Sequence, residues 1–140
     1  MDMKLVRLVY YSQASRSMSL SDLRNILQTA RSNNDELEVC GMLCFENQFF
    51  LQALEGDRET VNELYLDIAD DPRHEEATII SYDEVSEHTF AKWQMGYAGG
   101  SESFYELLRK NGQTEFDPEQ MTQAQAISFL VDMAAFQTEI

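Results

Sequence analysis

Gln52 is an amide within the most apolar stretch of the chain, and its type and position suggest chemistry more clearly than any other residue. It lies in the run Phe49–Leu54, which is short, aromatic-rich and bounded by turn residues, so the run predicts a buried strand. Side chains alternate between the faces of a strand, and Gln52 therefore shares an apolar face with Phe50 and Leu54. A buried amide without a partner costs about 1–3 kcal/mol, so Gln52 requires a hydrogen-bond partner. Because its head group both donates and accepts, it could be a structural link or a two-position switch.

Three other places carry side chains that could meet Gln52 or a ligand. Tyr10 is predicted to face inward at the end of a strand, and its hydroxyl needs a partner. The pair Asn33-Asn34 lies at a predicted helix end. The segment Trp93-Gln94-Met95 begins a predicted late strand, in which Trp93 and Met95 are expected to share one face. Each has an ordinary structural explanation when taken alone: a core tyrosine, asparagine at a helix C-terminus, and plain core.

Catalytic and metal-binding motifs are missing from the sequence, and the chain is not expected to be an enzyme. His74 and His88 fall in loop-like regions outside any metal-binding pattern, and no glycine-rich phosphate loop occurs. Cys40 and Cys44 are expected on one face of a strand, too far apart for a disulfide and without a neighbouring histidine, so they are interpreted as buried apolar residues. An acylphosphatase-like enzyme is disfavoured because residues 12–19 contain no glycine.

Size and charge restrict the class of protein further. The chain has 140 residues and a formal net charge of −15, with a sequence pI of about 4.3. This acidity argues against direct nucleic-acid binding and against anionic membranes, and favours partners with a basic face. No apolar run approaches the ~20 residues that span a bilayer, and the N-terminus has no secretory pattern, so a cytoplasmic location is expected.

Hydrophobic periodicity predicts the order βαββαβ followed by one further strand. The strands are expected at residues 5–11, 37–45, 49–54, 77–82 and 93–98, with a hairpin turn at residues 46–48. The first helix is expected to begin at a capping box of Ser19 and Asp22 and to end at Asn33-Asn34. The second is expected to begin at Asp57 and to end at Asp71-Pro72. This order predicts an α+β fold: a ferredoxin-like mixed sheet with an added fifth strand and two helices on one face.

The predicted topology brings the scattered polar residues together. The first and third strands are expected to be central neighbours, so that Tyr10 and Gln52 meet between the two helices. Ile26 and Ile68 would face each other across that gap. A flat aromatic ligand between two isoleucines, with amides at its polar edge, describes a flavin pocket.

The last forty residues are predicted to form an extension of a domain spanning residues 1–100. Residues 101–140 contain a short helix near Phe104–Leu108 and a second helix expected to open at Asp117-Pro118. The extension is too small for a core of its own, so it is expected to pack on the free face of the sheet or on a partner chain.

The chain resembles the BLUF family of blue-light sensors that use flavin, over about residues 4–98. Separate motifs occur in the family's order and at its intervals. The matching segments are residues 7–12 (RLVYYS), 33–34 (NN), 41–43 (GML), 50–56 (FLQALEG), 71–74 (DPRH) and 90–95. The tail is also similar to the two-helix extension of short, single-domain members.

The resemblance implies FAD as a non-covalently bound cofactor, with FMN or riboflavin as alternatives. It assigns Tyr10 as the photochemical tyrosine, Gln52 as the switching glutamine, and Trp93 and Met95 as residues linked to signal output. Asn34 is implied to bond the flavin ring, with Asn33 beside it. The remaining implied cofactor contacts are Ile26 and Ile68 on either side of the ring, and Asp71, Arg73 and His74 near its edge.

The implied function is a blue-light photoreceptor that signals by a light-driven rearrangement of the Tyr10–Gln52 hydrogen bond. Its signal is expected to pass to a downstream protein in trans, and the chain is expected to form a homo-oligomer. One position departs from the family: many members carry Arg or Lys where this chain has Asp67, and an ionised carboxylate cannot donate. The alternative is a colourless ferredoxin-like interaction module that has lost flavin binding, and the colour of the purified protein separates the two.

Overall fold

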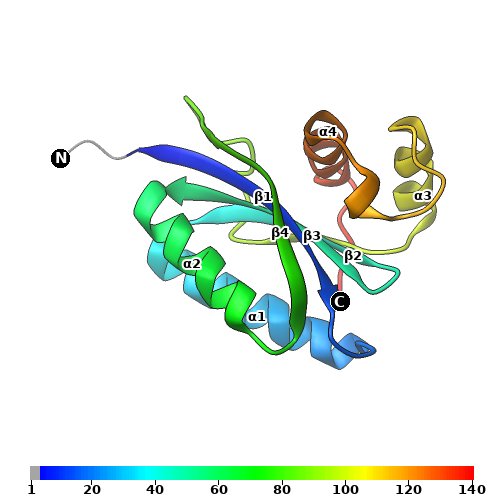
Figure 1. The fold of residues 1–140 in the computed structure, drawn as a ribbon, viewed down its shortest axis with the longest axis horizontal. Helices are drawn as coiled ribbons and strands as arrows, with labels where there is room; N and C mark the ends of the chain where they lie inside the picture. Colours follow the sequence, from blue (N-terminus) through cyan, green and yellow to red (C-terminus); the bar gives the residue numbers. More distant parts are fainter. Residues whose placement is uncertain (1–3) are drawn as a thin grey trace.

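The computed structural model describes residues 4–140; residues 1–3, the start of the predicted domain of residues 1–100, lie outside the described part of the chain. All five strands and the helices α1 and α2 come first along the chain, and only helices and turns follow β5 (Figure 1). In chain order they are β1 (Leu5–Ala14), α1 (Leu20–Leu37), β2 (Cys40–Glu46), β3 (Phe49–Asp57), α2 (Arg58–Asp70), β4 (His74–Glu84), β5 (Gly96–Ala98), α3 (Glu102–Lys110), the 3-10 turn η1 (Pro118–Gln120) and α4 (Gln123–Met133).

The strands form one five-stranded sheet in the order β4-β1-β3-β2-β5. All neighbours pair antiparallel except β5, which lies parallel to β2. The crossover through α1 leaves a gap between β1 and β2, and β3 fills that gap because a tight hairpin joins it to β2. The predicted α+β, ferredoxin-like sheet with an added fifth strand is therefore confirmed, as is the central pairing of β1 with β3.

The sheet separates two helical layers (Figure 1). Helices α1 and α2 lie on one face, and α3 and α4 lie on the other. The alternation of β3 divides its side chains between the layers as predicted: Phe50 and Leu54 belong to the core under α1 and α2, whereas Leu51 and Ala53 belong to the core under the tail. Gln52 consequently points toward the α1 and α2 layer.

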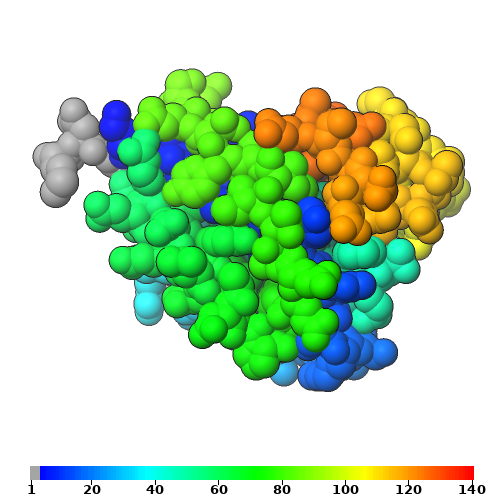
Figure 2. Space-filling view, viewed as in Figure 1, coloured from blue at the N-terminus to red at the C-terminus, as the bar shows by residue number. Residues whose placement is uncertain are grey.

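The tail packs directly on the sheet. The space-filling view shows it, in yellow and orange, against the blue and green segments of the sheet (Figure 2). Phe104, Phe116 and Phe129 are fully buried and meet edge to face or tilted, with ring centroids 5.1–6.0 Å apart. These rings share one apolar cluster with Leu51 and Ala53, so residues 101–140 contribute to the same core as the sheet.

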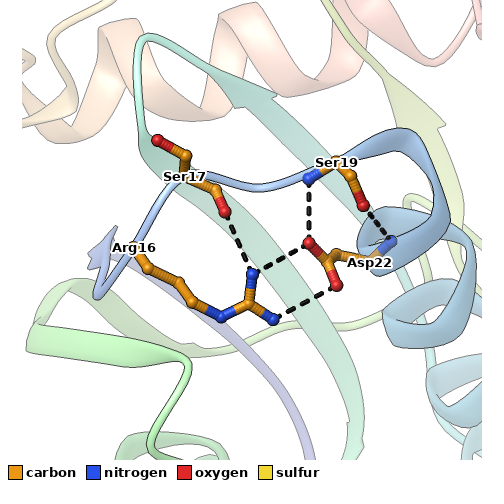
Figure 3. A network of polar contacts seen from close by, with 4 residues as sticks. All are labelled: Arg16, Ser17, Ser19 and Asp22. Carbon is orange, nitrogen blue, oxygen red and sulfur yellow. Dashed lines mark hydrogen bonds and ion pairs between the residues drawn. The ribbon is translucent and has the colours of Figure 1, made fainter.

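Helix α1 begins at the predicted capping box, which the structure confirms. The Asp22 amide donates to Ser19 Oγ at 3.1 Å, and the Ser19 amide donates to Asp22 Oδ2 at 2.9 Å. The Arg16 guanidinium joins both Asp22 oxygens, at 3.0 and 3.2 Å (Figure 3). This hydrogen bond from Arg16 lowers the pKa of Asp22, and the cluster fixes the path of the chain from β1 into α1.

The prediction that Asn33-Asn34 ends the first helix is wrong. Helix α1 continues to Leu37, and Glu38, with φ 56°, forms the left-handed C-cap. Asn34 is buried inside the last turns and donates to a carbonyl outside the helix, so a tertiary contact overrides its local preference for a helix end. As a result β2 starts at Cys40 and not at residue 37.

Other predicted boundaries also differ from the structure: β1, β3 and β4 extend beyond the predicted residues 5–11, 49–54 and 77–82. The fifth strand starts at Gly96, because residues 91–95 form turns and bends and not an extended chain. Asp117-Pro118 opens the 3-10 turn η1, and α4 begins after Thr122, whose hydroxyl accepts from the Gln125 amide. Asp57 occupies the N-cap position of α2, but its side chain makes no capping hydrogen bond.

Between residues 4 and 140, no helix has the length and apolar composition to cross a bilayer.

Candidate functional site

A cavity of about 160 Å³ lies between α1, α2 and the sheet. Its walls come from the two helices, its floor comes from β1, β2 and β3, and its rim includes the segment that leads into β4. The structure brings together here all of the residues predicted to contact the cofactor: Tyr10, Ile26, Asn33, Asn34, Gln52, Ile68, Asp71, Arg73 and His74. They come from five separate segments of the chain.

Tyr10 and Gln52 occupy opposite positions in the antiparallel pairing of β1 and β3. The Tyr10 hydroxyl donates a hydrogen bond to Gln52 Oε1. Tyr10 is fully buried and Gln52 is 5% exposed, so this bond is shielded from water. Burial raises the pKa of Tyr10 far above its ordinary value, which keeps the phenol protonated and therefore a donor.

The other end of the Gln52 amide contacts Met95. Gln52 Nε2 donates to Met95 Sδ at 3.3 Å, and Met95 is 2% exposed. Trp93 instead packs, partly buried, against the cluster on the tail side of the sheet. The sequence places these two residues on one face of a strand, and that prediction is wrong because the chain bends between them. Met95, and not Trp93, is the neighbour of Gln52.

The two asparagines lie on the α1 side of the cavity. Asn34 is buried and its Nδ2 donates to the Gln94 carbonyl at 2.6 Å, whereas Asn33 is exposed at the rim. Ile26 lines the same wall, and Ile68 lines the wall formed by α2. The cavity thus has apolar side walls and amide groups at one edge.

The rim near β4 carries paired charges and a neutral histidine. Asp71 accepts from the Arg73 guanidinium, with Nη2 at 2.7 Å and Nε at 3.0 Å, and this hydrogen bond lowers the pKa of Asp71. Burial lowers the pKa of His74 to about 4, and its Nδ1 lies 2.7 Å from Ser12 Oγ. Asp67 also lines the cavity, so its carboxylate adds negative charge to this rim.

Several lining residues were not predicted as site residues. They are the apolar or small residues Thr29, Ala30, Leu43, Phe50, Leu54 and Leu64. Two signals could have identified most of them. Thr29 and Ala30 follow Ile26 by three and four positions, so they share its helical face, and Phe50 and Leu54 share the face of Gln52 on β3.

The donor and acceptor groups of the cavity suit a flavin ring. Ile26 and Ile68 provide apolar contact for the faces of a planar heterocycle. Asn34 Oδ1 and the Gln52 amide provide groups for an edge that alternates carbonyl oxygens with nitrogens. Residues 4–140 contain no group of three or more His, Cys, Asp or Glu that could bind a metal ion. Cys40 and Cys44 are buried free thiols that belong to the cluster on the other face of the sheet, and burial raises the pKa of Cys40 to about 12.

Comparison with known proteins also indicates a flavin-binding protein. The family described as "BLUF: Sensors of blue-light using FAD" matches residues 5–96. The structure of BlsA in its photo-activated state is 33% identical, with a TM-score of 0.89 over 97% of this chain and 99% of that chain. The dark-state structure of the BLUF protein BlrB superposes with a TM-score of 0.82 at 23% identity, which shows a shared fold.

Curated relatives include photoactivated adenylate cyclase beta subunits. Those of Euglena longa and Euglena gracilis are each 38% identical over 95 residues, which is 67% of this chain. The chain spans about a tenth of their length, 11% in both cases, so the similarity covers one part of those proteins. From the family match and the BlsA structure together, the chain belongs to the BLUF family of flavin-binding blue-light sensors.

Proposed function

We propose that this chain is a blue-light photoreceptor in which rearrangement of the Tyr10–Gln52 hydrogen bond is the switch. The observation that carries the proposal is a buried tyrosine that donates to a buried glutamine at the floor of the cavity. We propose FAD as the ligand, because the family description names it. FMN and riboflavin share the ring that the cavity would contact, and they are alternative ligands.

The residues that would hold the flavin divide by role. Ile26 and Ile68 would contact the faces of the ring, and Asn33, Asn34 and Gln52 would bond its polar edge. Asp71, Arg73 and His74 lie at the rim, where the rest of the cofactor would leave the cavity. When bound, the flavin supplies absorption of blue light and an electron acceptor.

Tyr10 is the proposed donor of the electron and the proton. Its hydroxyl hydrogen already points at Gln52 Oε1, so the proton has a short path through the amide. If the Gln52 amide turns by half a rotation, Nε2 faces Tyr10 and Oε1 faces the Met95 sulfur. That rotation removes the donation from Nε2 to Met95 Sδ, so the state of the amide is transmitted to the segment that carries Met95. The electron and the proton would return to Tyr10 once the amide has turned, and return of the amide in the dark would then restore the starting state, so the chain acts as a switch and not as a turnover enzyme.

The output is proposed to be a protein–protein contact. Met95 is followed directly by β5, so β5 and the tail of residues 101–140 are the proposed signalling elements, the tail forming an extension of the flavin-binding domain of residues 1–100. The relatives named photoactivated adenylate cyclases link light to an effector within a longer protein. For this chain we propose a cytoplasmic partner in trans with a basic surface, since the net charge is −15, and self-association into a homo-oligomer.

Light-minus-dark absorption spectra of Gln52→Leu and Tyr10→Phe test the proposal. The wild-type protein is expected to be yellow and to shift slightly to the red in blue light, and both variants are expected to bind flavin without that shift. Tyr11→Phe is the matched control, because Tyr11 packs toward the tail side of the sheet. An unchanged red shift in both variants would defeat the switch assignment. A protein that stays colourless with added FAD would instead support the interaction module, for which Asp67 in the cavity lining is the favouring feature.

A further inference from the structure

Three successive carbonyl groups of the segment Trp93–Met95 accept hydrogen bonds from α1 and β2. The Trp93 carbonyl accepts from the Gly41 amide at 3.2 Å. The Gln94 carbonyl accepts from Asn34 Nδ2 at 2.6 Å, and the Met95 carbonyl accepts from Arg31 Nε at 2.9 Å. These bonds fix the bend that turns Met95 toward the cavity side and Trp93 toward the tail side.

Arg31 differs from the other two donors. Asn34 lines the cavity and Gly41 acts through its backbone, whereas Arg31 lies outside the cavity lining and reaches the segment with a charged side chain. Among residues 4–140, no carboxylate lies within ion-pair distance of Arg31. The Met95 carbonyl is therefore its hydrogen-bond partner within the described chain, and a cationic donor strengthens such a bond.

Met95 is held from two directions. Arg31 contacts its backbone, and Gln52 Nε2 contacts its sulfur at 3.3 Å. A methionine side chain has three rotatable bonds, so the sulfur keeps one position only when the backbone that carries it is fixed. Fixing the Met95 carbonyl thereby limits where its sulfur can meet the Gln52 amide.

We propose that Arg31 is a positioning residue for the Gln52 switch, acting through Met95. It holds the Met95 backbone so that the sulfur accepts from Gln52 Nε2, which favours the amide orientation in which Oε1 accepts from Tyr10. This inference rests on the proposed photoreceptor function. It predicts that loss of the Arg31 donor weakens the preference for the dark orientation and slows the return to it.

The experiment compares Arg31→Ala and Arg31→Lys with Arg24→Ala, an exposed arginine on the same helix. The first readout is the rate of dark recovery of the light-induced absorption shift in flavin-loaded protein. Arg31→Ala is expected to slow recovery about threefold to tenfold, the range for one lost hydrogen bond. Arg31→Lys keeps a cationic donor and is expected to restore part of the rate, and Arg24→Ala is expected to match the wild type.

The second readout needs no flavin. Trp93 is the only tryptophan of the chain, so its fluorescence reports this segment alone. In flavin-free protein, Arg31→Ala is expected to increase acrylamide quenching of Trp93, with Arg24→Ala unchanged. In a Met95→Ala background, Arg31→Ala is expected to cause no further change in dark recovery, because the residue it acts through is already removed.

Wild-type recovery and wild-type quenching in Arg31→Ala would overturn the assignment of Arg31. If the effects of Arg31→Ala and Met95→Ala on the dark-recovery rate add in full in the double variant, Arg31 does not act through Met95. A wild-type protein with no light response would overturn the proposed function instead, and Trp93 quenching in flavin-free protein would then still decide whether Arg31 anchors the segment.

Discussion

Tyr10 on β1 and Gln52 on β3 stand directly opposite each other, and the Tyr10 hydroxyl donates to Gln52 Oε1. The same amide donates from Nε2 to Met95 Sδ, just before β5. One buried side chain thus connects the first strand, the third strand and the segment leading to the last strand. Any change in the direction of this amide alters contacts on both sides of it.

The Tyr10–Gln52 bond is expected to contribute to stability as a coupled pair. Tyr10→Phe removes the donor to a buried carbonyl, and Gln52→Leu leaves a buried hydroxyl without its acceptor, so each is expected to cost about 1–3 kcal/mol. The double variant is expected to cost less than the sum of the two, because both changes break one bond. Urea unfolding of the flavin-free proteins measures the coupling, and strict additivity would show that the bond does not contribute.

Glu55 is expected to stabilise the loop between β4 and β5. Its carboxylate is fully buried and accepts from the Thr89 amide at 2.9 Å and from the Phe90 amide at 2.7 Å. Glu55→Gln replaces one acceptor oxygen with a donor group that faces these amides, so a loss of about 2 kcal/mol in unfolding free energy is expected. Glu63→Gln, at an exposed position of α2, serves as the control. Faster hydrogen exchange at the Thr89 and Phe90 amides should accompany the loss, and equal stability of the two variants would contradict the role.

His74 is expected to make stability depend on pH between about 6.5 and 4. Burial lowers its folded pKa to about 4, below the ordinary value of about 6.5 that applies to the unfolded chain. The contribution of the neutral His74 ring to the free energy of unfolding is therefore complete above pH ~6.5. As pH falls from there to about 4, protonation of the unfolded chain removes up to about 3 kcal/mol of that contribution.

The comparison of His74→Gln with the wild type isolates this contribution. The difference in unfolding free energy between the two is expected to shrink as pH falls from 7.5 to 4. A difference for His74→Gln that stays constant with pH would mean that the His74 ring is not the titrating group.

Asp67 is expected to weaken binding of phosphorylated flavins. Its carboxylate lines the cavity, and the rim cation Arg73 is already paired with Asp71. Asp67→Lys is expected to raise affinity for FAD and FMN about threefold or more at low salt and to change riboflavin affinity less, with the gain falling as salt rises. Fluorescence titration measures the affinity for each flavin. Asp70→Lys, at a position outside the cavity lining, is the control. An equal gain for all three flavins would contradict a charge effect on the phosphates.

The sequence by itself determined the frame of the site. Alternation in residues 49–54 predicted that Gln52 is buried and shares a face with Phe50 and Leu54, and the order of elements predicted that the first and third strands pair. The Ser19–Asp22 capping box was also predicted, because it depends on residues three apart. Such features follow from local periodicity, which sequence carries directly.

Only the tertiary structure decided which side chain meets Gln52 and where α1 ends. Asn34 continues the helix because its side chain reaches the Gln94 carbonyl, 60 positions away in the sequence. The bend between Trp93 and Met95 places Met95 on the cavity side of the sheet and Trp93 on the tail side, although their spacing suggests a common face. Hydrogen bonds between distant segments outweigh local propensity here, and they become available only when the chain has folded.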